Sequence, residues 1–208
     1  MSIRAIAWDV DGTLVDSEPL HHRALLAGSA AFGVDLSDLP DEAFRGVHMG
    51  EVWKILRSRL PETLEEAEWL AAIENHYVGH RHEIRIIAEA IETIRWVAEM
   101  GLQQVCVSNS GRVIVDANLD AMGVTTHIAF SISLDDVLRG KPDPWPYSHA
   151  CRRLGIAPSN VLAVEDSLTG ITSAVAAGLP CAALGFESGA GYVGVSRLGE
   201  LAGLLSGK

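Results

Sequence analysis

Two aspartates follow the first apolar stretch of this chain. Residues 3–8 form a short, nearly all-apolar run, and Asp9 and Asp11 come directly after it, before Gly12 and Thr13. Such a run predicts a buried strand that ends in two carboxylates. Side chains two residues apart in extended chain point the same way, so both carboxylates can face one small volume. Like charges held this close favour a bound cation, a shared proton, or both. The alternative is an Asp-rich turn that contains a glycine.

Polar residues also stand at three later positions in the chain. Ser108, Asn109 and Ser110 follow a second predicted strand, Glu165 and Asp166 follow a third, and Lys141 precedes a helix that Pro144 can open. Ligands of open α/β sheets bind outside the carboxyl ends of the strands, so these residues are expected at one crevice. Carboxylates and an ammonium there suit a divalent cation and a phosphoryl group, and Ser108 beside a helix N-terminus can donate to phosphate oxygens.

Each of these stretches also has a purely structural interpretation. Residues 108–111 could cap the next helix, and Lys141 could be an ordinary surface lysine. Asp166 or Ser167 could cap a helix while Glu165 is solvated. The occurrence of all these polar stretches in this order favours a catalytic site over four independent structural features.

A helical part is expected between two parts of an α/β pattern. Residues 17–87 predict only helices: Ser17 to Gly33 with Ser17 as N-cap, a short piece from Asp38, Glu51 to Leu60, and Glu62 to about Ile87. Beyond them the pattern predicts helix 88–100, strand 103–108, helix 112–122, strand 127–132, helix 144–154, strand 161–164, helix 167–177, a last strand 180–184, a glycine-rich loop and a helix 200–205. We therefore expect an α/β fold, a doubly wound parallel sheet, with a core of residues 1–16 and 88–208 and a helical cap of residues 17–87.

Composition limits the class of partner. The formal net charge of −11 over 208 residues argues against a nucleic-acid groove or an anionic membrane. No apolar run is long enough to span a bilayer, and the N-terminus lacks a signal-peptide layout, so a cytoplasmic protein is expected. Cys106, Cys151 and Cys181 lie among apolar neighbours and are expected to be buried and reduced.

The four polar stretches together resemble the four motifs of the haloacid dehalogenase (HAD) superfamily. They read Asp-Val-Asp-Gly-Thr at 9–13, Ser-Asn-Ser at 108–110, Lys-Pro-Asp-Pro at 141–144 and Glu-Asp-Ser-Leu-Thr-Gly-Ile at 165–171. The resemblance covers residues 3–186 and implies a Rossmann-like core with a class I helical cap. It is strongest to the β-phosphoglucomutase-like and phosphoglycolate-phosphatase-like branch, which shares the cap opening at residues 16–20.

This resemblance implies a role for each motif residue. Asp9 would be the nucleophile that forms an aspartyl phosphate, and Asp11 the general acid and base. Mg²⁺ would be held by the carboxylates of Asp9 and Asp166 and the backbone carbonyl of Asp11, with Glu165 in or next to the metal's coordination shell. Lys141 would offset negative charge and steady the nucleophile. Ser108, helped by the Asn109 amide, would bind a phosphate oxygen.

The cap is expected to select the substrate. Candidate substrate-binding residues are Glu18, His21 and Arg45, although Met49 stands where β-phosphoglucomutases carry a further arginine, which weakens a mutase assignment. Histidines 76, 80 and 82 have helical spacing but no fixed partner for a metal, so a solvated helix face is the simpler interpretation.

The expected function is a Mg²⁺-dependent phosphatase that acts on a small phosphorylated metabolite, such as a sugar phosphate or phosphoglycolate. The chain is expected to act as a monomer or weak dimer. A β-phosphoglucomutase-type mutase is the alternative, and a non-enzymatic binding protein is a third hypothesis. Asp11 argues against dehalogenases and phosphonatases, which lack this second aspartate.

Overall fold

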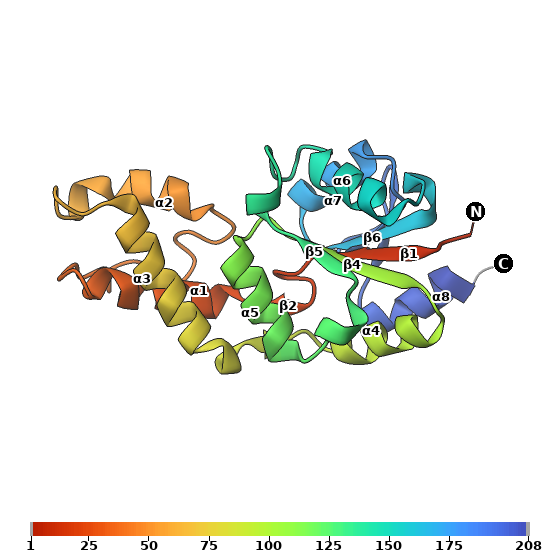
Figure 1. Ribbon diagram of the computed structural model, residues 1–208, viewed down its shortest axis with the longest axis horizontal. Helices are drawn as coiled ribbons and strands as arrows, with labels where there is room; N and C mark the ends of the chain where they lie inside the picture. The colour runs from red at the N-terminus through yellow and green to blue at the C-terminus, as the bar shows by residue number, and fades with distance from the viewer. Residues whose placement is uncertain (1, 207–208) are drawn as a thin grey trace. The chain divides into compact units, whose positions relative to one another are not determined.

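A computed structural model describes residues 2–206 of the chain (Figure 1). The chain forms two compact units. One comprises Met1–Asp16 with Ile86–Lys208, here called the core, and the other is Ser17–Arg85, here called the cap. The core therefore resumes at Ile86, two residues before residue 88, where the sequence predicts it.

The core is built on one parallel sheet of six strands. Their order is β5-β4-β1-β6-β7-β8, and every described strand pair is parallel. The strands are β1 (Ala5–Trp8), β4 (Gln103–Val107), β5 (Phe130–Ile132), β6 (Val161–Glu165), β7 (Cys181–Leu184) and β8 (Tyr192–Val195). Strand β1 is central, and its Ala7 pairs with Val105 on one side and Ala163 on the other. The predicted α/β sheet is confirmed.

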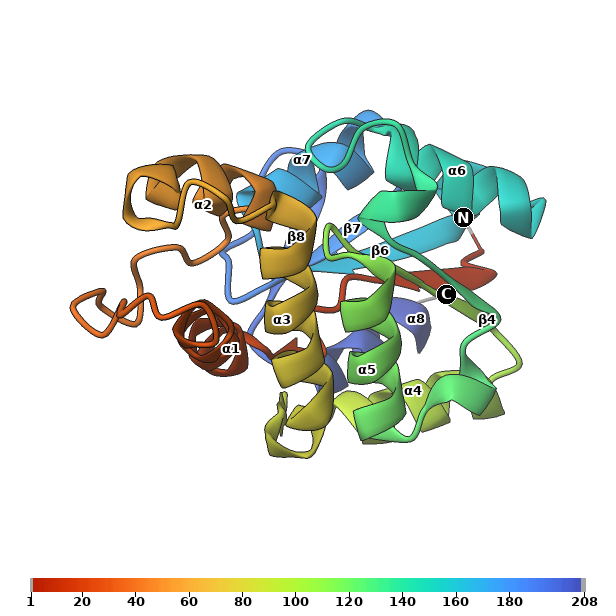
Figure 2. The same cartoon turned by 60° about the vertical axis from the view of Figure 1, so that its left-hand side comes forward.

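Helices cover both faces of this sheet, as Figures 1 and 2 show. They are α4 (Ala90–Glu99), α5 (Arg112–Met122), α6 (Trp145–Leu154), α7 (Leu168–Ala176) and α8 (Leu201–Ser206). Side chains of α6 and α7 pack on alternate sheet residues such as Ala5, Ala7 and Val105. Helices α5 and α6 end at Gly123 and Gly155, which take positive φ angles of 64° and 67° that glycine adopts without strain.

One core strand was missed. The segment after Phe186 is not wholly a loop, because β8 pairs in parallel with β7. Its Gly194 has no room for a side chain: a Cβ there would lie 2.1 Å from the carbonyl oxygen of Phe186. Glycine is therefore needed at position 194 because the backbone of another segment approaches it closely. The several glycines of this segment resemble the composition of a loop, which is why the strand was not predicted.

The cap consists mainly of helices α1 (Glu18–Ala30), α2 (Met49–Leu56) and α3 (Glu66–Gly79). Short 3₁₀ turns at Arg57–Arg59 and Arg81–Glu83 follow the last two, and strands β2 (Val15–Asp16) and β3 (Arg85–Ile86) form a separate two-stranded sheet. Helices α1 and α3 pack closely, since a Cβ on Gly28 would lie 2.5 Å from Ile73.

Three predictions for the cap were wrong in detail. The helix expected from Glu62 to Ile87 is only α3 with a turn and a strand after it, and the piece expected from Asp38 consists of turns. The Asp38 carboxylate accepts hydrogen bonds from Arg59, at 2.6 and 2.9 Å. Ser17 precedes α1 but makes no side-chain capping hydrogen bond.

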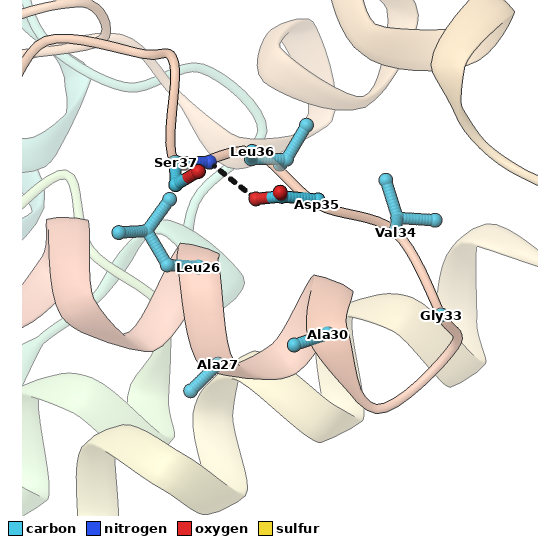
Figure 3. A pocket seen from close by; sticks show the side chains of 8 residues that line it. All are labelled: Leu26, Ala27, Ala30, Gly33, Val34, Asp35, Leu36 and Ser37. Carbon is cyan, nitrogen blue, oxygen red and sulfur yellow. Dashed lines mark hydrogen bonds between the residues drawn. The ribbon is translucent and has the colours of Figure 1, made fainter.

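The cap also carries an open depression beside the end of α1 (Figure 3). Its volume is about 410 Å³, and it is lined by Leu26, Ala27, Ala30 and residues 33–37. None of these is a residue that the sequence assigns to chemistry. Across residues 2–206, no helix has both the length and the apolar character needed to cross a membrane.

Candidate active site

The candidate site lies where β1, β4 and β6 end. Asp9 follows β1, and its Oδ1 accepts a hydrogen bond of 2.6 Å from the Lys141 ammonium. That ammonium also donates to the backbone carbonyl of Val107, at 2.7 Å, and to Glu165 Oε1, at 2.6 Å. Lys141 is buried, so it is not the surface lysine of the alternative interpretation. Three acceptors from three neighbouring strand ends fix its position.

Glu165 belongs to this buried network. Its Oε1 also accepts a 2.5 Å hydrogen bond from the Tyr147 hydroxyl, and the Lys141 ammonium lies 5.2 Å from the centre of the Tyr147 ring. Glu165 itself is fully buried. The carboxylate is therefore held by α6 as well as by Lys141, and it is not solvated.

Asp166 completes a group of acidic ligands. One carboxylate oxygen from each of Asp9, Glu165 and Asp166 lies within 4.8 Å of the others. Asp166 Oδ1 also accepts a hydrogen bond of 3.1 Å from the Thr13 hydroxyl. Among the residues described, this is the one group of three or more potential ligands that could hold a metal ion.

The charges of this group do not balance when all its carboxyls are ionised. Three carboxylates then face one ammonium, which leaves two negative charges that a divalent ion would offset. Burial raises the pKa of Asp166 to about 7, and the charge of Asp9 adds to the rise. Burial also raises the pKa of Glu165 to about 7, with Asp9 adding to the rise and Lys141 opposing it. The pKa of Asp9 is raised by burial, against the effect of Lys141.

An unpartnered oxygen marks the place for that cation. Asp9 Oδ2 is buried and has no hydrogen-bond partner. A buried carboxylate oxygen without a partner is costly, and hard divalent cations prefer oxygen ligands. The residues present therefore fit a divalent metal, which Asp9 and Asp166 would hold with Glu165 beside them.

Two glycines make room for the carboxylates. A Cβ on Gly12 would lie 2.0 Å from Asp166 Oδ2, and Gly12 has a φ of 91°. A Cβ on Gly170 would lie 1.9 Å from Glu165 Oε2. Both positions require glycine because the functional side chains occupy the space.

Asp11 points to a different set of partners. Its Oδ2 accepts from the Ser108 and Ser110 hydroxyls at 2.9 and 2.8 Å, and its Oδ1 accepts from the Asn118 amide at 3.1 Å. Its carboxylate is not in the acidic ligand group. The predicted metal contact of Asp11 concerns the backbone carbonyl and stays a prediction.

The 108–111 loop and the Lys141 loop are joined. Asn109 donates from Nδ2 to the Lys141 carbonyl at 3.0 Å and accepts from the Lys141 backbone N–H at 2.8 Å. Gly111 is the N-cap residue of α5, and α5 has no side-chain capping hydrogen bond there. The role of Ser108 and Asn109 in binding phosphate stays a prediction. Ser167 does cap α7, by accepting from Gly170 N–H at 3.0 Å, as the structural alternative proposed.

Two of the three candidate residues of the cap, Glu18 and His21, have partners within the cap. Glu18 accepts a hydrogen bond from Gly46 N–H at 3.1 Å, and the His21 ring centre lies 4.6 Å from that of Tyr77. Arg45 is exposed. Their role in binding substrate stays a prediction. His76 and His80 stack at 4.0 Å between ring centres.

Sequence reasoning missed Tyr147 and Asn118. Tyr147 lies in the first turn of α6, among buried residues, and resembles an ordinary core aromatic. Asn118 is fully buried on the apolar face that α5 forms with Ile114, Val115, Leu119 and Met122. A polar residue in an apolar helical stripe is the signal that could have indicated it.

Comparisons with known proteins agree with this geometry. A family model described as "haloacid dehalogenase-like hydrolase" matches residues 3–178. A phosphoglycolate phosphatase of Thiobacillus denitrificans is 29% identical over 91% of this chain and 87% of its own length. A 6-phosphogluconate phosphatase of Escherichia coli is 28% identical over 85% of this chain and 80% of its own length.

A solved structure is similar over nearly the whole chain. CbbY of Rhodobacter sphaeroides, in complex with phosphate, is 29% identical with a TM-score of 0.85, and 96% of each chain is covered. A variant of CbbY, solved in complex with xylulose-(1,5)-bisphosphate, is also 29% identical, with a TM-score of 0.84 and 96% of each chain covered.

Proposed function

Because this chain belongs to the haloacid dehalogenase-like hydrolases, we propose that it is a Mg²⁺-dependent phosphatase that acts on a small phosphorylated metabolite. The observation that carries the proposal is the buried, unpartnered Oδ2 of Asp9 beside Asp166, with Lys141 on the other oxygen of the same carboxylate. A nucleophile that must accept a phosphoryl group needs such an environment of positive charge.

Known relatives support the class of substrate. Two of them are named for phosphoglycolate and 6-phosphogluconate, and CbbY was solved with a sugar bisphosphate. These compounds share a small, acidic or polyhydroxylated carbon skeleton that bears a phosphate ester. We therefore propose a phosphate monoester of a sugar, sugar acid or hydroxy acid as the substrate.

The proposed reaction has two displacements at phosphorus. A carboxylate oxygen of Asp9 attacks the phosphorus, and the bond to the ester oxygen breaks while Asp11 donates a proton to that oxygen. Water then attacks the aspartyl phosphate, Asp11 takes a proton from the water, and inorganic phosphate leaves with the Asp9 carboxylate restored. Ser108 donates to a phosphate oxygen during both steps.

The bound divalent ion would supply positive charge at the phosphate and at the nucleophile. Lys141 holds Asp9 through Oδ1 and favours its ionised form, against the effect of burial on the pKa of Asp9. Its own pKa is raised by Asp9 and Glu165 against the effect of burial, so it stays charged at neutral pH. Glu165 in turn holds Lys141, with Tyr147 as a second donor to that carboxylate.

Phosphate release from a panel of phosphorylated metabolites tests the proposal. We expect release with Mg²⁺, none with chelator, and loss of release in Asp9→Asn with the variant still folded. Isomerisation of a sugar phosphate without net release would instead support a β-phosphoglucomutase-type mutase. Unchanged turnover in Asp9→Asn would contradict the assigned nucleophile.

A further inference from the structure

Asp11 is held by side chains from two different elements. Ser108 and Ser110, in the loop after β4, donate to one carboxylate oxygen, and Asn118, in the middle of α5, donates to the other. All three donors are neutral. Hydrogen bonds to both carboxylate oxygens of Asp11 therefore fix the orientation of the carboxylate plane.

Asn118 is a polar side chain in an apolar part of α5, and its amide nitrogen faces Asp11. Its side chain is fully buried, and the neighbouring buried positions of α5, Ile114, Val115, Leu119 and Met122, are apolar. Burying an amide costs free energy unless it is hydrogen-bonded, so a leucine would ordinarily suit this helix face better. A carboxylate can only accept, so the Asn118 amide nitrogen must face it.

Binding of a phosphate would change the set of donors. The Ser108 hydroxyl donates to Asp11 and accepts from Ser110 N–H in this structure. In the proposed function it donates to a phosphate oxygen instead. Ser110 and Asn118 would still donate to Asp11 while the ester bond breaks.

We propose that Asn118, together with Ser110, is a positioning residue that aligns Asp11 with the leaving oxygen of the substrate. The inference rests on the proposed function. It predicts that Asn118 matters when the leaving group needs a proton and matters little when it does not. Misplacement of a catalytic group by about 1 Å can cost about 100-fold in rate.

The test compares two substrates that differ in their leaving groups. β-Glycerophosphate releases an alkoxide that must be protonated, whereas p-nitrophenyl phosphate releases a stable phenolate. For Asn118→Leu, which keeps the branching of the side chain but removes the donor, we expect kcat/KM for β-glycerophosphate to fall about 10- to 100-fold. For p-nitrophenyl phosphate we expect a fall of less than about threefold, since Asp11 contributes little there. Ser110→Ala should give the same pattern and removes only a partly exposed hydroxyl, so it decides the question if Asn118→Leu does not fold.

A double-mutant cycle and a matched control complete the experiment. In an Asp11→Asn background, Asn118→Leu should cause no further loss, because its effect passes through Asp11. Asp116→Asn, on the exposed side of the same helix, should leave the ratio of the two kcat/KM values unchanged. An equal fall for both substrates, or a further loss in the Asp11→Asn background, would overturn the positioning role alone. A wild-type protein that releases phosphate from neither substrate nor from the metabolite panel would overturn the proposed function, and this inference with it.

Discussion

The buried ion pairs of Lys141 in the core and the exposed ion pair of Arg59 in the cap have the same closest distance but differ in their access to water. In the core, Lys141 lies 2.6 Å from Asp9 and 2.6 Å from Glu165, and these three side chains are 3%, 8% and 0% exposed. In the cap, Arg59 lies 2.6 Å from Asp38, with 35% and 65% of the two side chains exposed. The distance between the charges therefore does not distinguish them, and their access to water does.

This difference reverses the direction of the pKa shift. The hydrogen bond from Arg59 lowers the pKa of Asp38. The Asp38 carboxylate stays in contact with water, so the opposing effect of burial is smaller than that of the hydrogen bond. Burial raises the pKa of Asp9, although Lys141 is equally near. A surface pair is a nearly neutral feature for stability, whereas the buried cluster holds excess negative charge that suits it to bind a cation.

Removing the cation of each pair should give the largest contrast. Lys141→Met leaves Asp9 and Glu165 buried without a counter-charge, so we expect a loss of stability on the order of 3–5 kcal/mol. Phosphate release should fall by about 10³-fold or more, because the charge that offsets the nucleophile is gone. Arg59→Met is the matched control and should change neither property measurably. Urea unfolding and phosphate release, measured on both variants, check the prediction; equal effects would refute the comparison.

Metal-free protein should lose stability as pH rises. The carboxyls of Glu165 and Asp166 have a pKa of about 7 in the folded chain, well above their ordinary values near 4. Between about pH 4 and pH 7 the folded state therefore binds more protons than the unfolded state, and stability falls as pH rises through this window. Thermal midpoints in chelator should show this fall, and added Mg²⁺ should remove it by binding the ionised form. A midpoint in chelator that rises from pH 5 to pH 7 would contradict the charge assignment.

Asp9→Asn should stabilise the metal-free protein while it abolishes turnover. The substitution removes one negative charge from a buried group that has an excess of them, and it gives the unpartnered Oδ2 position an amide group. We expect a rise on the order of 1 kcal/mol in the free energy of unfolding in chelator. Denaturant melts of the variant and wild type in chelator measure it. A destabilised variant would mean that the pairing of Asp9 with Lys141 outweighs the repulsion.

Asp38→Asn is expected to have the smallest effect. Its carboxylate is exposed, so the midpoint at neutral pH should move by less than about 2 °C. The pKa of Asp38 is lowered in the folded chain, so its small contribution exists above the unfolded pKa and disappears as pH falls through the folded pKa. Thermal melts of both proteins at pH 7 and at pH 3 should therefore differ less at the lower pH. A large shift at pH 7 would show that Arg59 and Asp38 carry more of the cap's stability than their exposure suggests.

Local patterns predicted most of the core and less of the cap. Strands β1, β4 and β6 are short apolar runs followed by polar residues, and α5 and α6 end at glycines, so both kinds of element carry their boundaries in the sequence. The 62–87 segment has helical composition throughout, yet only Glu66–Gly79 forms a long helix. That helix ends at Gly79, a glycine that is itself a local stop signal, but the prediction extended the helix past it.

The sequence determined that Asp9, Asp11, Ser108, Glu165 and Asp166 stand at or just after the ends of strands, and parallel strands bring their carboxyl ends to one edge. Tertiary structure alone decided that Lys141 is buried against Asp9 and Glu165, that Tyr147 joins them, and that Asn118 holds Asp11. These contacts join residues 18 to 132 positions apart in the chain, and no local pattern records which buried donor meets which acceptor. Burial in the finished fold also sets the pKa values, because the loss of water is a property of the packed core and not of the residue type.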